Sequence, residues 1–410
     1  MEPTRRMLLK GAFAAAAATM TGWSPGCAAD GPARHLILVT AFGGWDTTWS
    51  FDPKPSVPGI DVGPGDAASF AGIPLWTDPS RPVARRFFDQ FADRCAVVNG
   101  VSVRSISHVE CMRRMLTGTS AHHAPDLGAI AGIELGADRP IPYLVLGDIA
   151  YPGTLESTTG RAGPSNQLAT LVEPAPGWRP TDGDEAAIRR FTEARIARER
   201  AVRGSQGENQ ARIDAFVAGL DQRDLLLQRA GDLGAPELRM GMASQRALAI
   251  RALETGLSSA VSLSAGVTFD SHTDNDAQGR FHETLFGNLE ALLTDLDDRP
   301  GVDGGRTMLD ETLVMVTTEM GRTPMLNAEL GKDHWPWASA LLFGAGVRGG
   351  RVYGATDDTF QGVPVDLETG DPSPAGTILE NGHVAAGVLA CLGIDPGRWL
   401  DDAPLAGLRA

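Results

Sequence analysis

The chain has 410 residues, 42% of them hydrophobic and 21% charged, a balance typical of a globular protein with a sizeable core. Its net charge of −15 and pI of about 5.0 argue against nucleic acid or an anionic membrane surface as the main partner. Only one long apolar run exists, at the N-terminus, which excludes a bundle of transmembrane helices.

The N-terminal run begins "TRRMLLKGAFAAAAATMTG", in which Arg5 and Arg6 precede an alanine-rich stretch. A pair of arginines before a modest apolar region is typical of the twin-arginine signal, which exports proteins that have already folded. We therefore predict a signal peptide over 1–29 and a mature domain over 30–410, without a transmembrane segment, in the periplasm or outside the cell. An ordinary N-terminal amphipathic or membrane helix is the alternative.

Cysteine usage gives one further hint about localisation. Cys27, in "SPGC", is a candidate for a lipid anchor, although Ser24 stands where a leucine-like residue is usual. Cys95, Cys111 and Cys391 are widely separated and show no CxxC spacing. Their odd number argues against a disulfide framework or a zinc–thiolate site, so we interpret them as small core residues.

Short apolar runs rich in β-branched residues recur along the chain and predict strands. They lie at 35–41, 95–100, 142–147, 266–269, 312–318 and 339–346. Runs that are apolar on both faces are typical of central strands in a mostly parallel sheet covered on each side. The predicted fold class is therefore α/β.

Segments with helical periodicity separate these runs. The segment 281–299 has an apolar stripe and ends before Pro300. The segment 184–258 is long, charged and free of strand-like runs, so we predict a helical insertion or cap, joined to the core by the proline-rich stretch 174–180.

Polar residues follow several of the predicted strands, where ligands bind in open parallel sheets. They are Asp46 after the first strand, Ser105, Ser107 and His108 after the second, Asp270 and His272 after 266–269, and Glu319, Arg322, Asp333 and His334 after 312–318. A carboxylate at a single strand end is usually a helix cap or a surface residue, but the repetition at four ends indicates a site.

The Asp270-x-His272 spacing points both side chains the same way on an extended segment. Imidazole nitrogen with carboxylate oxygen suits zinc, manganese or iron. With Glu319, Asp333 and His334 nearby, we predict a cation site. The remaining histidines are interpreted as ordinary hydrogen-bonded residues: His35, His122, His123, His282 and His383.

Several motifs together resemble one known family. They are "FGGWD", "SHVECMRRMLTG", "FDSHTD", "TLVMVTTEMGRTP", "GKDHWPWASALLFGAGVRGGRVYGATD" and "GVLACLGIDP". Their order and spacing resemble the DUF1501 family, which commonly carries a twin-arginine signal and is placed in the alkaline phosphatase-like (sulfatase-like) superfamily. The resemblance covers most of 35–400, and "EMGRTP…DHWP" is its most specific part.

This resemblance implies a three-layer α/β/α sandwich with divalent metals at the strand carboxyl ends. A nucleophile at a helix N-terminus would attack a phosphate or sulfate ester. The metal ligands that it implies are Asp46, Asp270, His272, Glu319, Asp333 and His334. The number of metals and their identity stay open, with zinc, manganese and calcium as candidates.

The sequence departs from the sulfatase pattern at two places. The sulfatase nucleophile stands nine residues before the threonine of "LTG", and counting back from Thr117 gives His108. Ser107 is therefore the candidate hydroxyl nucleophile, and His108 is a metal ligand or a general acid/base. "EMGR" replaces an Asp-His pair, and Arg322 would either clamp a tetrahedral anion or pair with a neighbouring acid.

The first functional hypothesis is an exported, metal-dependent hydrolase of phosphate or sulfate esters. Its substrate would be a small anionic ester or a sulfated or phosphorylated glycan. The alternative is a non-catalytic envelope protein that keeps the fold, with or without a structural metal, and binds a glycan or a protein partner. A transferase of phospho-substituents would use the same nucleophile.

Overall fold

The computed structural model describes residues 33–162, 180–204, 206–229, 241–302 and 304–410. The predicted signal peptide over 1–29, Cys27 and most of the proline-rich stretch 174–180 lie outside these ranges. Within the described part of the chain, no helix combines the length and apolar character needed to span a membrane.

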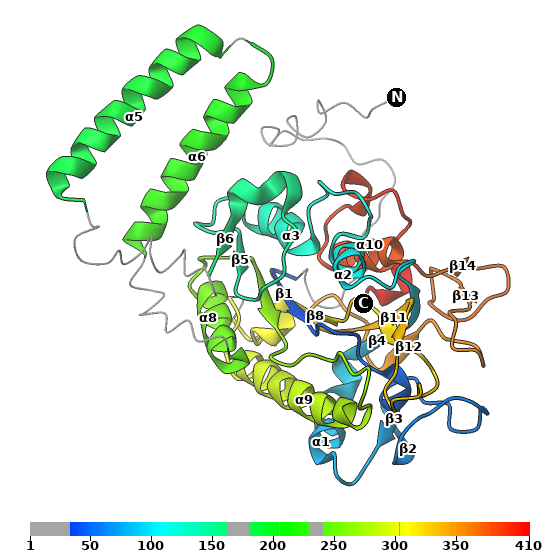
Figure 1. Ribbon diagram of the computed structural model, residues 1–410. Helices are drawn as coiled ribbons and strands as arrows, with labels where there is room; N and C mark the ends of the chain where they lie inside the picture. Colours follow the sequence, from blue (N-terminus) through cyan, green and yellow to red (C-terminus); the bar gives the residue numbers. More distant parts are fainter. Residues whose placement is uncertain (1–32, 163–179, 205, 230–240, 303) are drawn as a thin grey trace.

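A sheet of eight strands forms the centre of the molecule, in the order β12-β4-β11-β8-β1-β7-β5-β6 (Figure 1). The strands are β1 His35–Thr40, β4 Cys95–Ser102, β5 Tyr143–Val145, β6 Thr159–Arg161, β7 Ala260–Ser264, β8 Thr312–Thr317, β11 Trp337–Gly344 and β12 Arg351–Tyr353. All neighbouring pairs are parallel except those of β11, which runs antiparallel to β4 and β8. The predicted mostly parallel sheet is therefore confirmed.

Helices cover both faces of this sheet. The described α-helices are α1 Pro82–Phe91, α2 His108–Thr117, α3 Leu127–Gly136, α5 Asp182–Arg203, α6 Asn209–Gln228, α8 Met242–Glu254, α9 Asp276–Asp297 and α10 Asn381–Cys391. In β1, Ile37 and Val39 enter the core shared with α1, α8 and α9, whereas Leu36 and Leu38 enter the core shared with α2, α3 and α10. Because alternate residues of one strand fill two different cores, the fold is a three-layer α/β/α sandwich.

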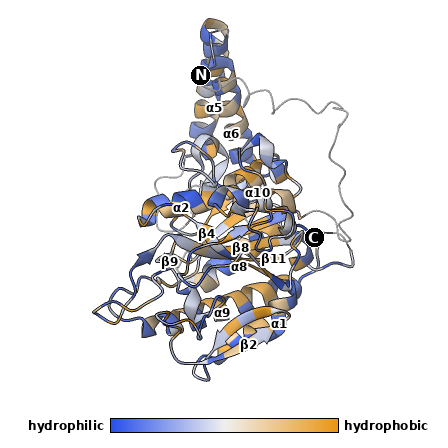
Figure 2. Ribbon diagram, turned by 90° about the vertical axis from the view of Figure 1, so that its right-hand side faces the viewer, coloured by the Kyte–Doolittle hydropathy of each residue, from blue (hydrophilic) through white to orange (hydrophobic). Residues whose placement is uncertain are grey.

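The hydropathy colouring agrees with this layering: the strands and the flanking helices α1 and α9 carry many hydrophobic residues (Figure 2). The apolar stripe predicted for 281–299 lies on α9 and faces the hydrophobic core. Its residues Leu285, Leu289, Leu292 and Leu296 are fully buried. That helix begins five residues earlier than predicted, at Asp276.

One predicted strand is wrong. The run 266–269 is not a strand, and the sheet instead contains β7, whose sequence is "AVSLS". The alternating serines of β7 predict a strand with one exposed face. Ser262 is nevertheless buried, because β7 lies between β1 and β5. The turn at 265–268 then carries the chain to Asp270.

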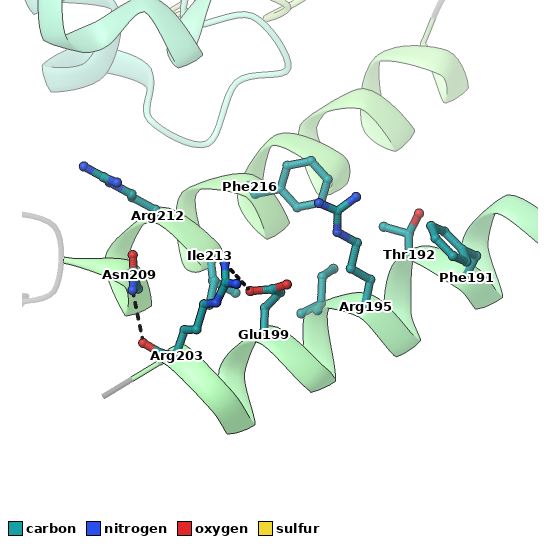
Figure 3. Close-up of a pocket in the computed structure, with 10 residues that line it drawn as sticks. Phe191, Thr192, Arg195, Glu199, Arg203, Asn209, Arg212, Ile213 and Phe216 are labelled. Carbon is teal, nitrogen blue, oxygen red and sulfur yellow. Dashed lines mark hydrogen bonds and ion pairs between the residues drawn. The ribbon is translucent and has the colours of Figure 1, made fainter. Parts of the chain in front are cut away.

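In the described part of 184–258, three helices have different surroundings. α8 packs on the sheet and buries Leu248, Ala249 and Leu253 in the core. α5 has no buried residue, and α5 and α6 form a hairpin that extends from the body (Figure 1). A hollow of about 420 Å³ between these two helices is lined by their own side chains, including Phe191, Arg195 and Phe216 (Figure 3). None of the predicted site residues lines it.

Among the described residues, three small antiparallel pairs lie outside the central sheet: β2 Asp66–Phe70 with β3 Ile73–Thr77, β9 Gly321–Arg322 with β10 His334–Trp335, and β13 Pro364–Val365 with β14 Thr377–Ile378. The pair β9–β10 is important for the site because it places His334 directly opposite Arg322. The Asp333-His334 segment is thereby fixed beside the end of β8.

Candidate functional site

The loops that follow β1, β7 and β8 are tied together at the carboxyl ends of these strands. Gly43 N–H donates to Glu319 Oε1 at 2.8 Å, and Phe269 N–H donates to the Phe42 carbonyl at 2.8 Å. Gly43 has φ of +110°, and a Cβ there would lie 2.5 Å from Asp270 N. Only glycine allows this close approach, which brings Asp270 next to the first loop.

His108 is the first residue of α2 and is held by Glu319. The Nδ1 atom of His108 lies 2.6 Å from Oε1 of Glu319, a residue that is fully buried. Because a carboxylate can only accept, Nδ1 carries a proton, and in the neutral ring Nε2 keeps its lone pair. That Nε2 lies 3.6 Å from Asp270 Oδ2.

His334 is oriented in the same manner by the main chain. Its Nδ1–H donates to the Ile106 carbonyl at 2.8 Å, which leaves Nε2 as the atom with a lone pair. Burial lowers the pKa of His334 below its ordinary value and outweighs the hydrogen bond to Ile106, which raises it. The ring is therefore held neutral, the form that binds metals.

His272 completes the set of histidines. Its Nδ1 lies 3.0 Å from Asp333 Oδ1, and this hydrogen bond lowers the pKa of the Asp333 carboxyl below its ordinary value. Asp333 therefore acts as the acceptor of the Nδ1–H, and in the neutral ring His272 Nε2 keeps its lone pair. That Nε2 lies 3.0 Å from His334 Nε2 and 3.2 Å from Asp270 Oδ1.

Three imidazoles thus point their Nε2 atoms toward Asp270, while each Nδ1 lies against an oxygen acceptor. In the described part of the chain, His108, Asp270 and His334 bring one ligand atom each within 4.8 Å of one another. Nitrogens of one tetrahedral zinc site are about 3.3 Å apart, given bonds of about 2.0–2.1 Å. The gap between the His272 and His334 Nε2 atoms is 3.0 Å, which fits either an N–H···N hydrogen bond or two nitrogens on one metal ion. The residues therefore fit a divalent ion.

Arg322 lies beneath this cluster rather than in solvent. Its side chain is fully buried and donates to Asp270 Oδ1 at 2.6 Å. The remaining donors bind carbonyls: Nε binds Gly44 at 3.0 Å, Nη1 binds Lys332 at 3.0 Å, and Nη2 also binds Gly43. Although partial burial raises the pKa of Asp270, the bond and charge of Arg322 hold it below its ordinary value. Arg322 thus keeps Asp270 ionised and positioned.

Asp46 lies in a different environment from the one that the resemblance implies. Its carboxylate is fully buried and forms an ion pair with the fully buried Lys332, at 2.7 Å. It also accepts from Thr48 N–H and Oγ1 and from Asn275 Nδ2. These contacts occupy the carboxylate, which caps the short 3-10 helix Thr47–Trp49. Among the described acids and histidines, it does not belong to the cluster of His108, Asp270 and His334.

Ser107 is the N-cap residue of α2, and its side chain makes no capping hydrogen bond. The residue is exposed and adjoins His108. Cys111 lies one turn further along, buried, and burial raises the pKa of its thiol. A high thiol pKa and a core position agree with its interpretation as a packing residue.

Sequence reasoning missed four residues that support the site. Lys332 stands in "GKDHW" immediately before Asp333, but no pattern in the sequence links it to Asp46. Asn327 Nδ2 donates to the His272 carbonyl at 2.9 Å, and Gln278 bridges Asp46 N–H and the Phe269 carbonyl. The Ile106 carbonyl is invisible to sequence analysis because any residue supplies one.

Comparison with known proteins identifies the family. The family model described as "Protein of unknown function (DUF1501)" matches residues 33–369. The chain therefore belongs to the DUF1501 family, which confirms the resemblance of its motifs. No curated protein matches the chain.

Three solved structures are similar to it over most of its length. They are the PH0037 protein from Pyrococcus horikoshii (12% identity, TM-score 0.36, 88% of this chain and 98% of that one), the PsFucS1 sulfatase from Pseudoalteromonas sp. (10%, 0.38, 93% and 73%), and the lipoteichoic acid synthase LtaP from Listeria monocytogenes (9%, 0.38, 92% and 76%). Similarities of this size say nothing about activity. The fold class rests on the strand order and the layers described above.

Proposed function

We propose that this protein is an exported, metal-dependent hydrolase of phosphate or sulfate esters, related to the alkaline phosphatase-like superfamily. The observation that carries the proposal is the convergence of the His108, His272 and His334 Nε2 atoms on Asp270. Each ring is oriented by a defined acceptor at its Nδ1, so that its Nε2 faces Asp270. Metal-ligating histidines almost always have such a partner at the second ring nitrogen.

The ligands we propose are the cluster of His108, His334 and Asp270, together with His272, whose Nε2 lies 3.0 Å from His334 Nε2 and 3.2 Å from Asp270 Oδ1. A divalent metal held there supplies a Lewis acid that stabilises charge on the ester oxygens and favours ionisation of a nearby hydroxyl. Glu319 and Asp333 hold the rings of His108 and His272 in place. Both carboxylates therefore act as positioning residues.

We assign the role of nucleophile to Ser107. Its Oγ would form a bond to the phosphorus or sulfur atom while the bond to the leaving alcohol oxygen breaks, and that alcohol departs with a proton. Water would then cleave the serine ester, releasing phosphate or sulfate and returning the proton to Ser107. The position of Ser107 at the N-terminus of α2 supports this role, since the helix dipole favours an anionic centre there.

Metal analysis combined with turnover tests the proposal. The purified protein is expected to hold a transition metal in stoichiometric amount and to cleave aryl phosphates or aryl sulfates in a chelator-sensitive reaction. Ser107→Ala should abolish turnover and retain the metal. Ser105→Ala removes only the acceptor of the Ser107 main-chain N–H, so it should retain the metal and lower turnover much less. Metal-free protein with no turnover of any ester would refute the proposal.

A non-catalytic binding protein is the second candidate, and the position of Arg322 favours it. A hydrolase of anionic esters needs a cationic group at the anion, yet the donors of Arg322 bind Asp270 and three carbonyls. A metal would then have to carry this role alone. Stoichiometric metal without turnover would identify this second function.

Localisation and domain organisation belong to the same proposal. The Arg5-Arg6 pair supports export to the periplasm or beyond, with Cys27 as a candidate lipid anchor. We propose one α/β domain over 30–410 and place the insertion of the 184–258 region in the α5–α6 hairpin, because α8 packs in the core. Cell fractionation of the wild type and of Arg5→Lys/Arg6→Lys tests the export route.

A further inference from the structure

A second hollow lies next to the histidine cluster and has a different chemical character. Its volume is about 590 Å³, within the range of small-molecule sites. It lies over the carboxyl ends of β1 and β7 and beside the first turns of α2. Its apolar and aromatic lining is Phe42, Val109, Met112, Ile149, Tyr151 and Val267. We call it the Phe42 pocket.

The Phe42 pocket shares a wall with the proposed metal site. The ring centroids of Phe42 and His108 are 4.9 Å apart, so the wall is one aromatic side chain thick. Val109 directly follows His108, and Thr268, another lining residue, precedes Asp270 by two positions. The pocket and the cluster are therefore immediate neighbours at the same edge of the sheet.

The charge of the lining restricts what binds there. The described residues that line the pocket include no lysine, arginine or histidine. The charged residue among them is Asp148. Arg113 lies over the Tyr151 ring, 5.4 Å from its centroid, but is not part of the lining. An anionic group in the pocket would meet the Asp148 carboxylate without a lining cation, while a neutral ring or alkyl chain would bury apolar area.

We propose that the Phe42 pocket binds the neutral, apolar alcohol part of the substrate, an aryl or alkyl group whose single anionic ester lies at the histidine cluster. This inference rests on the proposed hydrolase function and narrows its substrate class. Glycans with many sulfate or phosphate groups fit poorly, because their further anions would face Asp148. Esters with one anionic group and an apolar alcohol fit well.

Direct binding tests the pocket independently of turnover. The full-length protein as purified is titrated with 2-naphthol and with 2-naphthol-6,8-disulfonate, each with and without chelator, and binding is followed by fluorescence. We expect saturable binding of 2-naphthol that survives the chelator, and at least tenfold weaker binding of the disulfonate in chelator.

Val109→Asp is the main variant, with Val202→Asp as its control. Both valines are 62% exposed on helices, and Val202 lies on α5 in the hairpin. Val109→Asp should weaken 2-naphthol binding about fivefold or more, the effect of losing one apolar contact and adding a charge, whereas Val202→Asp should leave it unchanged. Ile149→Ala provides a second pocket variant, and thermal melts check that each variant is folded.

The outcomes separate this inference from the proposed function. If 2-naphthol binds and Val109→Asp weakens it, while no ester is turned over, the pocket stands and the hydrolase proposal fails. If esters are turned over but 2-naphthol does not bind, or binds Val109→Asp and wild type equally, the pocket assignment is overturned. Tighter binding of the disulfonate than of 2-naphthol in chelator would overturn it as well.

Discussion

Glu319→Gln probes the carboxylate that holds His108, and the structure sets its expected effect. The substitution keeps the shape of the side chain but removes the charge that accepts the His108 Nδ1–H at 2.6 Å and the Gly43 N–H at 2.8 Å. Loss of such a partner of a ligating histidine typically weakens metal affinity 10–100-fold. This corresponds to about 1.4–2.7 kcal/mol of binding free energy.

Chelator competition with zinc measures this affinity directly. Thermal unfolding with and without zinc gives a second estimate, since stabilisation by a ligand depends on its affinity for the folded state. In excess zinc, the metal-induced gain in unfolding free energy should be smaller by about 1.4–2.7 kcal/mol in Glu319→Gln than in the wild type.

Glu311→Gln is the matched control, because Glu311 is also fully buried and accepts a main-chain N–H, that of Val302. It should lower stability without changing zinc affinity. Equal zinc affinity of Glu319→Gln and wild type, or an equal loss in Glu311→Gln, would refute the role of Glu319 in holding a metal ligand.

Three further predictions concern the fold around the site. Lys332→Met should destabilise the protein by about 3–5 kcal/mol in urea unfolding, because Asp46 stays buried without its cation; adding Asp46→Asn should recover part of this loss, and a purely additive double variant would argue against the pairing. Gly43→Ala should lower the melting temperature far more than Gly59→Ala. Both glycines have positive φ, but a Cβ at Gly43 would lie 2.5 Å from a backbone nitrogen of the facing loop, whereas Gly59 has nothing within 4 Å; equal losses would contradict this reasoning. Burial lowers the pKa of His282 to about 4, so the unfolded chain binds a proton below about pH 6.5 that the folded chain rejects. Stability should therefore fall as the pH drops from 6.5 toward 4, by about 1.4 kcal/mol per unit from this residue, and His282→Phe should show a shallower fall; an unchanged pH slope would count against it.

Much of the fold could be predicted because its local signals agree with its burial. β1 and β8 carry apolar residues on both of their faces, because helices cover both faces of the sheet. The helix α9 repeats leucine at a helical period. β7 was misplaced because its serines suggest exposure, and only its position between β1 and β5 explains why they are buried.

The candidate site was predicted as a set of residue types at one edge of the sheet. The sequence could not show which of these residues are ligands and which hold the ligands in place. Glu319 and Asp333 were expected as ligands, and the structure instead places each against the Nδ1 atom of a histidine. That distinction depends on which ring nitrogen faces which oxygen, a matter of ångströms that spacing along the chain does not encode.

The sequence by itself determined the α/β class, the family and the edge at which polar residues gather, because these follow from hydrophobic period, motif order and the direction of parallel strands. Tertiary structure alone decided that Asp46 pairs with Lys332, 286 positions away, and that the buried Arg322 forms an ion pair with Asp270. The physical reason is that a buried charge must find an opposite charge or donors wherever the fold brings them close. Such partners are chosen in space and leave no periodic trace in the sequence.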